Sequence, residues 1–386
     1  MTALAPAPPA LDLTPARLEG LTAALGQHAE RHDRDASFPW EGLRAVHAAG
    51  LLTSTASGGP GLSGTDAVRA FQALGQGDPS VALVASQTVF LHAAQAADPV
   101  WPEGLYAEVL ARSAQRPVLL NSARAEPELG APARGGLPAT TVRRTAAGWV
   151  LDGRKAYVTG SEGLDVHLVW AVSDEPEPTI GHVVVPGDHP GVEVVRTWDH
   201  LGLRASSTHD VVYRGVEVPA DHFRGVPVGS VPNNTGPRPG PGGALHLAVP
   251  ALYLGVARAA QAFLTRFAHE RVPTALGRPI ATTERIQTVA GEIEAQLVQA
   301  EELLLGLAAR IEAGDEEAVA RAGVAKLLVG RAAIGAVHAA VAALGNPGLT
   351  RGHPLERHWR DVQCIRPHPP QDDAALLAAG RRALAR

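Results

Sequence analysis

The hydrophobic positions of the chain fall into three stretches with different periods. From residue 14 to about residue 113 they recur at helical spacing, as in Leu18, Leu21 and Leu25 after the start at Thr14-Pro15. Threonine as a cap and proline at the first helical position are typical of a helix N-terminus. Further helices are predicted over residues 39–52 and 65–74, and a strongly apolar helix, expected to be buried, over 81–97.

From Pro117 the pattern changes to short runs rich in β-branched residues, separated by Gly, Pro, Asp and Ser. These runs predict strands over residues 118–120, 149–151, 156–159, 166–171, 182–185, 192–196 and 211–213. Short strands with regular turn signals favour an antiparallel sandwich or barrel.

After Ala244 the helical period returns, with one apolar stripe from Ile286 to Leu307 and another from Val324 to Leu344. Long apolar helices with short connections predict an antiparallel bundle. Residues 225–243 are too rich in Pro and Gly for a regular element and indicate a linker or mobile loop. We therefore expect an α+β protein with a helical domain over 1–114, a β-domain over 115–226 and a bundle over 227–386, whose first residues, 227–243, are the linker.

Composition limits the class of protein. The net charge of −5 gives no general attraction to nucleic acid or anionic lipid, and no apolar run reaches the 18 residues of a membrane span. The N-terminal residues lack the basic and apolar regions of a signal peptide. The single cysteine, Cys364, excludes an intrachain disulfide framework, and arginine supplies almost all the basic charge, since the only lysines are Lys155 and Lys326. A cytoplasmic protein that binds neither membrane nor nucleic acid is expected.

Two glycine-containing segments could bind a cofactor. Gly59 to Gly64 (GPGLSG) fits a dinucleotide-binding pattern, but no alternation of strands and helices follows it, so a plain glycine-rich loop is the preferred interpretation. Residues 157–163 (YVTGSEG) end a strand-like segment with small hydroxyl and glycine residues. Such an end exposes backbone and side-chain donors that suit a ring with carbonyl and nitrogen acceptors, although an ordinary turn has the same composition.

Two further residues are candidates for chemistry near the C-terminal half. Arg204, in the loop LGLRASST, could bind an anion or pair with a carboxylate. His368 lies among prolines in a segment that cannot be helical, and a rigid loop can hold one imidazole in place for proton transfer. The alternatives are a polar loop and a surface histidine in a tail.

Six segments in order resemble the acyl-CoA dehydrogenase superfamily over nearly the whole chain. They are AAGLL with GGPGLS and DPSVAL, then AEP, GWVLDGRKAYVTG, LGLRASSTHDVVYRGVEVP, HERVPTALGRP, and finally LGNPGL with HPLERHWRD. The resemblance implies a helical N-terminal domain, a central antiparallel β-domain and a C-terminal four-helix bundle. It also implies a flavin between β-domain and bundle, and a homotetramer.

The resemblance assigns roles to particular residues. It places Thr159 beside the N5 edge of the flavin and Tyr157 beside its ring, with Ser122 and Ala125 also contacting the cofactor. On the bundle, Arg271 matches an arginine that reaches the flavin phosphates of a neighbouring subunit, and Gly345 and Gly348 match glycines of a loop near the same cofactor.

The positions of the dehydrogenase base and substrate loop differ from the family pattern. The glutamate that removes the α-proton of an acyl thioester is replaced by Pro369, and its alternative place falls near Leu245. Glu128 and the residues after it replace the small turn that holds the substrate, and Ala342 replaces a glutamine that meets the adenine of FAD. FMN is therefore possible as well as FAD.

The segment His368-Pro369-Pro370 resembles instead the His-x-Pro of flavin monooxygenases such as dibenzothiophene monooxygenase. In that branch the histidine assists the reaction of reduced flavin with O₂, and a separate reductase supplies the flavin. The favoured hypothesis is a two-component monooxygenase acting on a small apolar or aromatic substrate, with His368 and Thr159 as catalytic residues. The alternatives are an acyl-CoA dehydrogenase with a displaced base, Asp372 or Asp373, and a flavin-binding protein without turnover.

Overall fold

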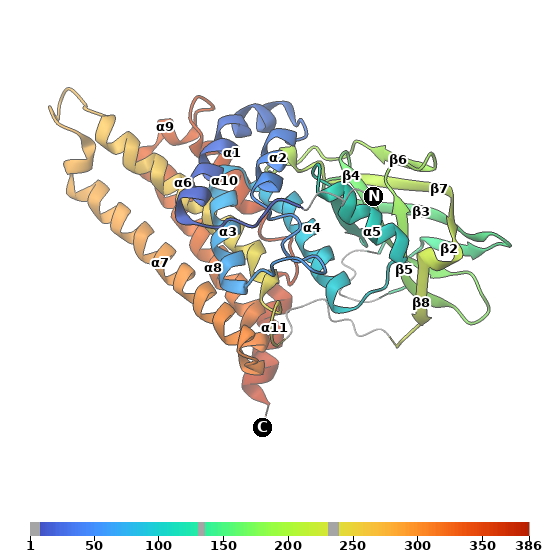
Figure 1. The fold of residues 1–386 in the computed structure, drawn as a ribbon. Helices are drawn as coiled ribbons and strands as arrows, with labels where there is room; N and C mark the ends of the chain where they lie inside the picture. The colour runs from blue at the N-terminus through green and yellow to red at the C-terminus, as the bar shows by residue number, and fades with distance from the viewer. Residues whose placement is uncertain (1–7, 130–135, 231–238, 386) are drawn as a thin grey trace.

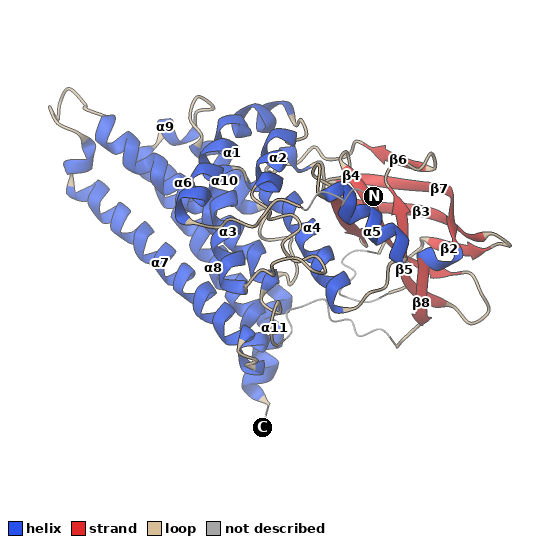
Figure 2. Cartoon of the chain, in the orientation of Figure 1, coloured by secondary structure: helices blue, strands red, loops and turns tan. Residues whose placement is uncertain are grey.

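The computed structural model describes residues 8–129, 136–230 and 239–385. Helices occupy both ends of the sequence and strands the middle, and Figure 2 shows the strands gathered at one end of the molecule. The N-terminal helices are α1 (Pro15–Asp35), α2 (Trp40–Ala48), α3 (Gly64–Gly77), α4 (Pro79–Ala97) and α5 (Glu103–Ser113).

Side-chain caps begin several of the predicted N-terminal helices. The Thr14 hydroxyl accepts a hydrogen bond from the Arg17 N–H at the start of α1, as the sequence predicts. Asp78 caps α4 in the same way, accepting from the Ser80 N–H at 2.8 Å. Helix α4 is buried along most of its length, which confirms the expectation for residues 81–97.

The central domain is one sheet of eight strands in the order β6-β7-β3-β2-β4-β5-β8, with β1 paired to β4. The strands are β1 (Leu119–Ala123), β2 (Thr141–Arg144), β3 (Gly148–Val158), β4 (Leu164–Ser173), β5 (Thr179–Pro186), β6 (Val192–Val195), β7 (His209–Pro219) and β8 (Phe223–Pro227). Most pairings are antiparallel, as predicted, but β1 and β2 both run parallel to β4. The predicted strands over 149–151 and 156–159 are one continuous strand, β3, whereas β2 and β8 have no counterpart in the prediction.

The C-terminal helices form the bundle at the other end of the molecule (Figure 1). They are α6 (Ala248–Glu270), α7 (Glu284–Glu312), α8 (Glu316–Leu344), α9 (Asn346–Leu349), α10 (Leu355–Gln363) and α11 (Asp372–Leu384). Residues 245–270 and 316–344 are long and apolar enough to cross a membrane by composition, but 72% and 50% of their most apolar windows are buried inside the protein. This burial fits core helices of a soluble fold.

The segment GPGLSG forms a loop, whereas residues 225–227, at the start of the Pro- and Gly-rich stretch, are the end of strand β8 and not part of a linker. Residues 59–63 of GPGLSG are a loop between α2 and α3, with Ser63 capping α3, and no strand precedes it in the described part of the N-terminal domain. The interpretation as a plain loop agrees with this arrangement. The predicted linker over 227–243 lies partly outside the described residues, and so does the substrate-loop segment after Leu129.

Helices α3 and α6 approach so closely that their contact requires glycine. A Cβ on Gly75 would lie 2.0 Å from the Leu252 carbonyl oxygen, and a Cβ on Gly255 would lie 2.1 Å from the Gln72 carbonyl oxygen. Both helices must therefore separate before either position can accept a side chain.

We expect Gly75→Ala to lower the free energy of unfolding by about 2 kcal/mol or more, because overpacking a close contact forces the backbone to move. Urea denaturation measures the loss. Gly20→Ala, on an exposed part of α1 with no neighbour within 4 Å, is the matched control and should be neutral or slightly stabilising. Equal midpoints for the two variants would contradict the close-packing argument.

Candidate functional site

Thr159 lies immediately after β3, in a buried network of hydroxyl groups. Its Oγ1 accepts a hydrogen bond from the Thr208 hydroxyl at 3.1 Å, and its carbonyl oxygen accepts from the Asn121 side-chain amide at 2.8 Å. Because Oγ1 acts as acceptor toward Thr208, the Thr159 hydroxyl keeps its own proton available for donation. The residue is 9% exposed, so that donor is held in place at the end of the strand.

The other three predicted contacts on the β-domain lie beside Thr159. Tyr157 has a positive φ of 56° and its side chain is 68% exposed, an unusual combination for a large aromatic residue at the end of a central strand. The carbonyl oxygen of Ala125 accepts from the Ala156 N–H at 2.9 Å, which joins the end of β1 to β3. Ser122, on β1, hydrogen-bonds through its Oγ to His182 Nε2 at 3.0 Å. These four residues therefore form one group.

This group fits a flat heteroaromatic cofactor such as a flavin. The exposed Tyr157 ring offers a surface for packing, and the Thr159 hydroxyl offers a donor to a ring nitrogen. The side chain of Arg124, between Ser122 and Ala125, has a buried Nε that makes no hydrogen bond to any described residue. Buried polar atoms normally have partners, so a polar group is needed at this place.

His368 lies in the turn between α10 and α11 and points into the bundle. Its Nε2 is 2.7 Å from the hydroxyl oxygen of Tyr253, a residue of α6 that is fully buried. Loss of hydration, together with a smaller effect of the nearby Lys326 ammonium, lowers the pKa of His368 to about 4. Burial also raises the pKa of Tyr253 above its usual range. The pair is therefore neutral at physiological pH.

The segment 203–208 connects the Thr159 network to the helix that precedes His368. The Ser206 hydroxyl is 2.7 Å from the Thr208 hydroxyl, and the Leu203 N–H donates to Asp361 Oδ1 at 2.8 Å. Asp361 belongs to α10, which ends at Gln363, and Cys364 after it lies 3.7 Å from His200 Nδ1. Hydrogen bonds along this segment therefore link the Thr159 end of β3 to α10, and the turn that contains His368 follows that helix.

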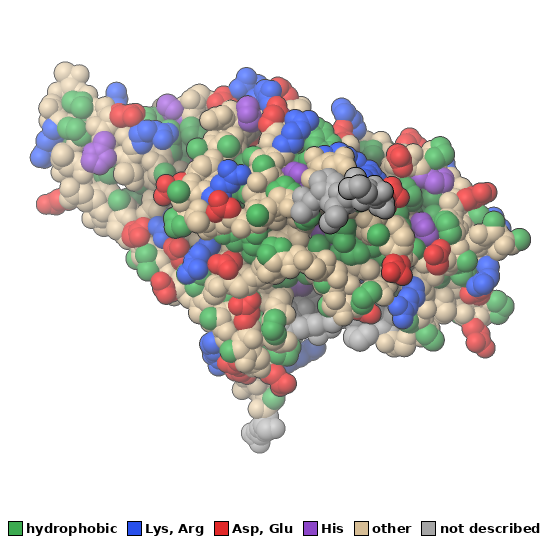
Figure 3. All heavy atoms as spheres, in the orientation of Figure 1, with side chains coloured by type: hydrophobic (Ala, Val, Ile, Leu, Met, Phe, Trp, Pro, Cys, Tyr) green, Lys and Arg blue, Asp and Glu red, His purple; other side chains and the backbone are tan. Residues whose placement is uncertain are grey.

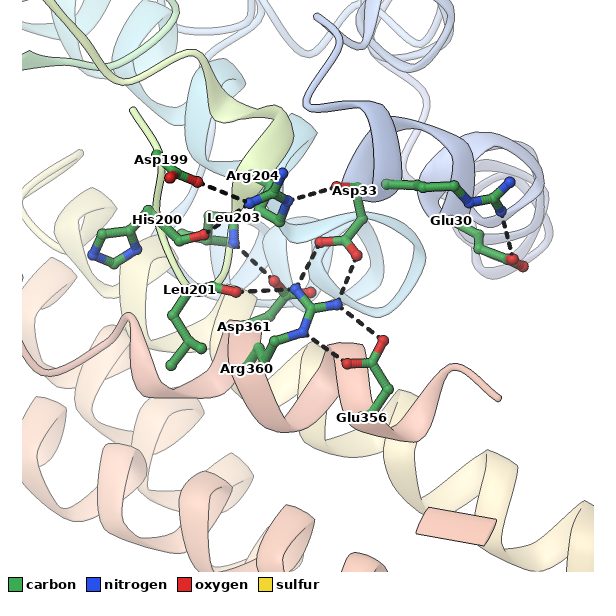
Figure 4. Close-up of polar contacts among 11 residues, drawn as sticks. Glu30, Asp33, Asp199, His200, Leu201, Leu203, Arg204, Glu356, Arg360 and Asp361 are labelled. Atoms are coloured by element: carbon green, nitrogen blue, oxygen red, sulfur yellow. Dashed lines mark hydrogen bonds and ion pairs between the residues drawn. The ribbon is translucent and has the colours of Figure 1, made fainter. Parts of the chain in front are cut away.

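Figure 4 shows that Arg360 holds three parts of the chain together at this network. Its guanidinium donates to both carboxylate oxygens of Asp33 on α1, at 2.9 and 2.7 Å, and to the Glu356 carboxylate on its own helix. It also donates to the Leu201 carbonyl oxygen of the β-domain at 2.9 Å. We call this group the Arg360 clamp. Arg204 donates to the Asp33 carbonyl oxygen at 2.8 Å and approaches Asp199, so of its two predicted roles the structure supports carboxylate pairing.

We expect Arg360→Met to lower the free energy of unfolding by about 3 kcal/mol, because it leaves two mostly buried carboxylates without their cation. Arg34→Met is the matched control, since Arg34 pairs with Glu30 on the same helix and both side chains are exposed. Surface pairs of this kind contribute about 0.5 kcal/mol or less. Chemical denaturation of both variants measures the difference, and similar losses would rule out a clamp.

The remaining predicted cofactor residues lie elsewhere. Arg271 caps the C-terminus of α6, and Gly345 and Gly348 follow α8, all at the end of the bundle that points away from the sheet (Figure 1). Gly345 has a φ of +63° and lets α8 turn sharply into α9. Within one chain these three residues do not meet Thr159, as expected if they serve the cofactor of a neighbouring subunit.

The cavity beside the His368 turn belongs to the bundle alone. It has a volume of about 460 Å³ and lies between α8 and residues 365–372, lined by Lys326, Arg331, His338, Arg366, Asp372 and apolar residues of α8. Lys326 is buried and its ammonium is 3.7 Å from Asp372. No described residue of the β-domain lines this cavity, so it is separate from the group around Thr159.

Two carboxylates near the His368 turn, those of Asp372 and Asp361, already have interaction partners. Leu245 is buried, and Pro369 cannot accept a proton. Asp372 faces Lys326, and Asp361 accepts a backbone hydrogen bond while burial raises its pKa to about 7. His368 is the neutral residue of this turn whose ring can take up a proton at one nitrogen while it releases one from the other.

Two features of the candidate site cannot be predicted from the sequence. Tyr253 sits within an apolar helix, where its spacing is that of a core residue, and only the fold shows its hydroxyl facing His368. Asp33 is 327 positions away from Arg360, so no local pattern links them. The Arg360–Glu356 ion pair is different, because the two residues lie four positions apart on α10.

Comparison with known proteins agrees with this architecture. Models of the N-terminal, middle and C-terminal domains of acyl-CoA dehydrogenases match residues 20–98, 122–216 and 247–370. The Bacillus subtilis protein YdbM, assigned by name to the acyl-CoA dehydrogenases, is 33% identical over 355 residues and 91% of each chain. The bovine mitochondrial short-chain specific acyl-CoA dehydrogenase is 30% identical over 62% of this chain and 57% of its own.

Solved structures show the same fold. KijD3, solved in complex with dTDP, is 26% identical, has a TM-score of 0.81 and covers 97% of this chain and 98% of its own. TdsC from Paenibacillus sp. A11-2, solved with FMN and indole, has a TM-score of 0.82 over 96% of both chains at 23% identity, which shows the common fold. This chain is a member of the acyl-CoA dehydrogenase family, a family of flavoprotein oxidoreductases.

Proposed function

We propose that this protein is a two-component flavin monooxygenase that uses reduced flavin and O₂ to oxidise a small apolar or aromatic molecule. The observation that carries the proposal is the neutral His368–Tyr253 pair, which occupies the turn where a dehydrogenase would hold its carboxylate base. An imidazole with a pKa of about 4 neither bears a charge nor removes a weakly acidic α-proton effectively.

The hydrogen bond to Tyr253 defines where the proton of His368 lies. Burial keeps Tyr253 protonated. Among the described residues, the hydrogen-bond partner of the Tyr253 hydroxyl is His368. The hydroxyl therefore donates to Nε2, so the proton of the neutral ring is on Nδ1. An imidazole oriented in this way presents its Nδ1–H as a donor, and transfer of that proton would be balanced by transfer of the Tyr253 hydroxyl proton to Nε2, with the tyrosine reprotonated afterwards from water.

The residues that would hold the cofactor are Thr159, Tyr157, Ser122 and Ala125 of one chain and Arg271, Gly345 and Gly348 of a second copy. A reduced flavin, FMN or FAD, supplies two electrons, one oxygen atom enters the substrate and the other leaves as water. A separate reductase would provide the reduced flavin, and the divided cofactor residues favour a homotetramer.

One experiment tests the proposal directly. The purified protein is supplied with chemically reduced FMN or FAD and oxygen, and a panel of indoles, thiophenes and phenols is screened for products that incorporate ¹⁸O₂. Incorporation of one labelled oxygen supports the monooxygenase. Hydrogen peroxide formed without any labelled product, for every substrate and both flavins, would overturn it and leave a flavin-binding protein without turnover.

The second candidate is an acyl-CoA dehydrogenase with a displaced base, Asp372 or Asp373. The observation in its favour is the 33% identity to YdbM over nearly the full length of both chains. Its test is anaerobic addition of short-, medium- and long-chain acyl-CoA to the flavin-loaded protein. Bleaching of the oxidised flavin band would establish this activity, and Asp372→Asn should then abolish the bleaching if that residue is the base.

A further inference from the structure

Four side chains form a row across the sheet on the side of β1 that carries Ser122. Trp170 of β4 is paired with His182 of β5, which is paired with Arg224 of β8. Arg124 continues the row at the other end, because the residue before it is paired with Val169. The order across the strands is therefore arginine, tryptophan, histidine, arginine, and we call it the Arg124–Arg224 row.

Contacts within the row fix its aromatic centre. The Arg124 guanidinium lies 4.7 Å from the centre of the Trp170 ring, and the Trp170 and His182 rings are also 4.7 Å apart. Burial and the nearby Arg124 charge lower the pKa of His182 to about 3, so the histidine is a neutral ring. Positive charge in the row comes from the two arginines alone.

A pocket of about 160 Å³ opens beside this row. It is lined by Trp170, His182, Arg224 and apolar residues, among them Val100, Leu168 and Ile180, and none of the described lining residues is acidic. A cavity of roughly 150 Å³ holds one benzene molecule, so the pocket has room for a single ring. Among the described residues, Arg224 makes a long hydrogen bond of 3.4 Å to the Pro99 carbonyl oxygen, and none is a partner for the buried Nε of Arg124.

We infer that the Arg124–Arg224 row and its pocket bind a single-ring aromatic anion, with the ring against Trp170 and His182 and the carboxylate on Arg224. Flat rings pack well on tryptophan and histidine, and guanidinium groups bind carboxylates through charge-assisted hydrogen bonds. Ser122, a predicted flavin contact, is hydrogen-bonded to His182, so the pocket adjoins the proposed cofactor group. If the proposed function holds, this anion is the substrate, so that assignment rests on the proposed function. The binding of the anion does not depend on it.

Binding of 4-fluorobenzoate to the full-length protein, followed by ¹⁹F NMR titration without added flavin, tests the inference. We expect saturable binding, with 4-fluorobenzamide at least tenfold weaker because it lacks the charge. Arg224→Met should weaken 4-fluorobenzoate binding by about tenfold or more, the equivalent of one charge-assisted hydrogen bond.

The matched control is Arg144→Met. Arg144 also stacks on a tryptophan of the same sheet, Trp149, with its guanidinium 5.1 Å from the ring centre. It does not line the pocket beside the Arg124–Arg224 row. This variant should bind 4-fluorobenzoate like the natural chain. Equal binding of the acid and the amide, an unchanged affinity in Arg224→Met, or an equal loss in both variants would overturn the inference. Because no flavin is present, a negative result leaves the proposed monooxygenase activity untouched.

Discussion

His368→Gln is expected to lower the rate of oxygenated product formation by about 100-fold or more, the usual contribution of a positioned acid or base. Glutamine keeps the approximate length of the side chain and can still accept a hydrogen bond from the Tyr253 hydroxyl, but its amide cannot pass a proton from one atom to another as an imidazole ring does. Binding of oxidised flavin, measured by fluorescence quenching, should change little. Product formation and hydrogen peroxide release are measured together, because faulty proton transfer is expected to increase the release of hydrogen peroxide at the expense of oxygenated product.

Two companion variants make this result interpretable. Tyr253→Phe keeps the ring in α6 but removes the hydrogen bond that holds Nε2, so about a tenfold loss and an altered pH profile are expected. His338→Gln replaces an exposed histidine of α8 that belongs to the bundle cavity and should leave product formation unchanged. A His368→Gln enzyme that matches the natural protein would remove His368 from the chemistry.

Acidification from pH 7.5 to 5 is expected to lower the free energy of unfolding by several kcal/mol. Five histidines have pKa values lowered to about 3 or 4, mainly by burial: His92, His167, His182, His358 and His368. Between about pH 6.5 and 4 each takes up a proton in the unfolded chain but not in the native protein, so each contributes a loss of up to about 1.4 kcal/mol per pH unit.

Asp361 acts in the opposite direction. Its pKa is raised to about 7 by burial, so below pH 7 the native protein holds a proton that the unfolded chain releases, and this group gains stability on acidification. This gain in the free energy of unfolding offsets the loss caused by about one of the five histidines. Urea midpoints at pH 7.5, 6.5, 5.5 and 5.0 measure the balance, and His92→Gln, in the buried pair with Tyr106, should reduce the slope. A midpoint that does not fall with pH would show that these histidines keep ordinary pKa values.

The sequence specifies the local elements better than their assembly. The cap at Thr14 and the continuous apolar run of α4 predict real helices because their causes lie within a few residues. Strands β2 and β8 escape prediction because they are short and largely polar or exposed, and their pairing partners lie far along the chain. The parallel pairing of β1 with β4 depends on the path of the chain around the sheet, which no local alternation encodes.

The residues of the candidate site also fall into those that local sequence predicts and those that it does not. Residues 157–159 are recognisable from strand and turn chemistry, and the Pro-rich segment makes His368 a candidate. The Tyr253 hydroxyl and the Arg360 clamp depend on long-range packing. The resemblance to a family supplies Arg271, Gly345 and Gly348, and the structure of one chain does not bring these three residues to Thr159.

The burial of Lys155 and Lys326 has a practical consequence for chemical probing. Lys155 has no exposed surface and is bound to Glu126 at 2.6 Å, and Lys326 is 5% exposed beside Asp372. The chain has no other lysine, and its single thiol, Cys364, is buried as well. Acylating and alkylating reagents therefore find no exposed lysine or cysteine in the native protein, so the rate at which these three side chains are labelled reports how often the folded chain opens.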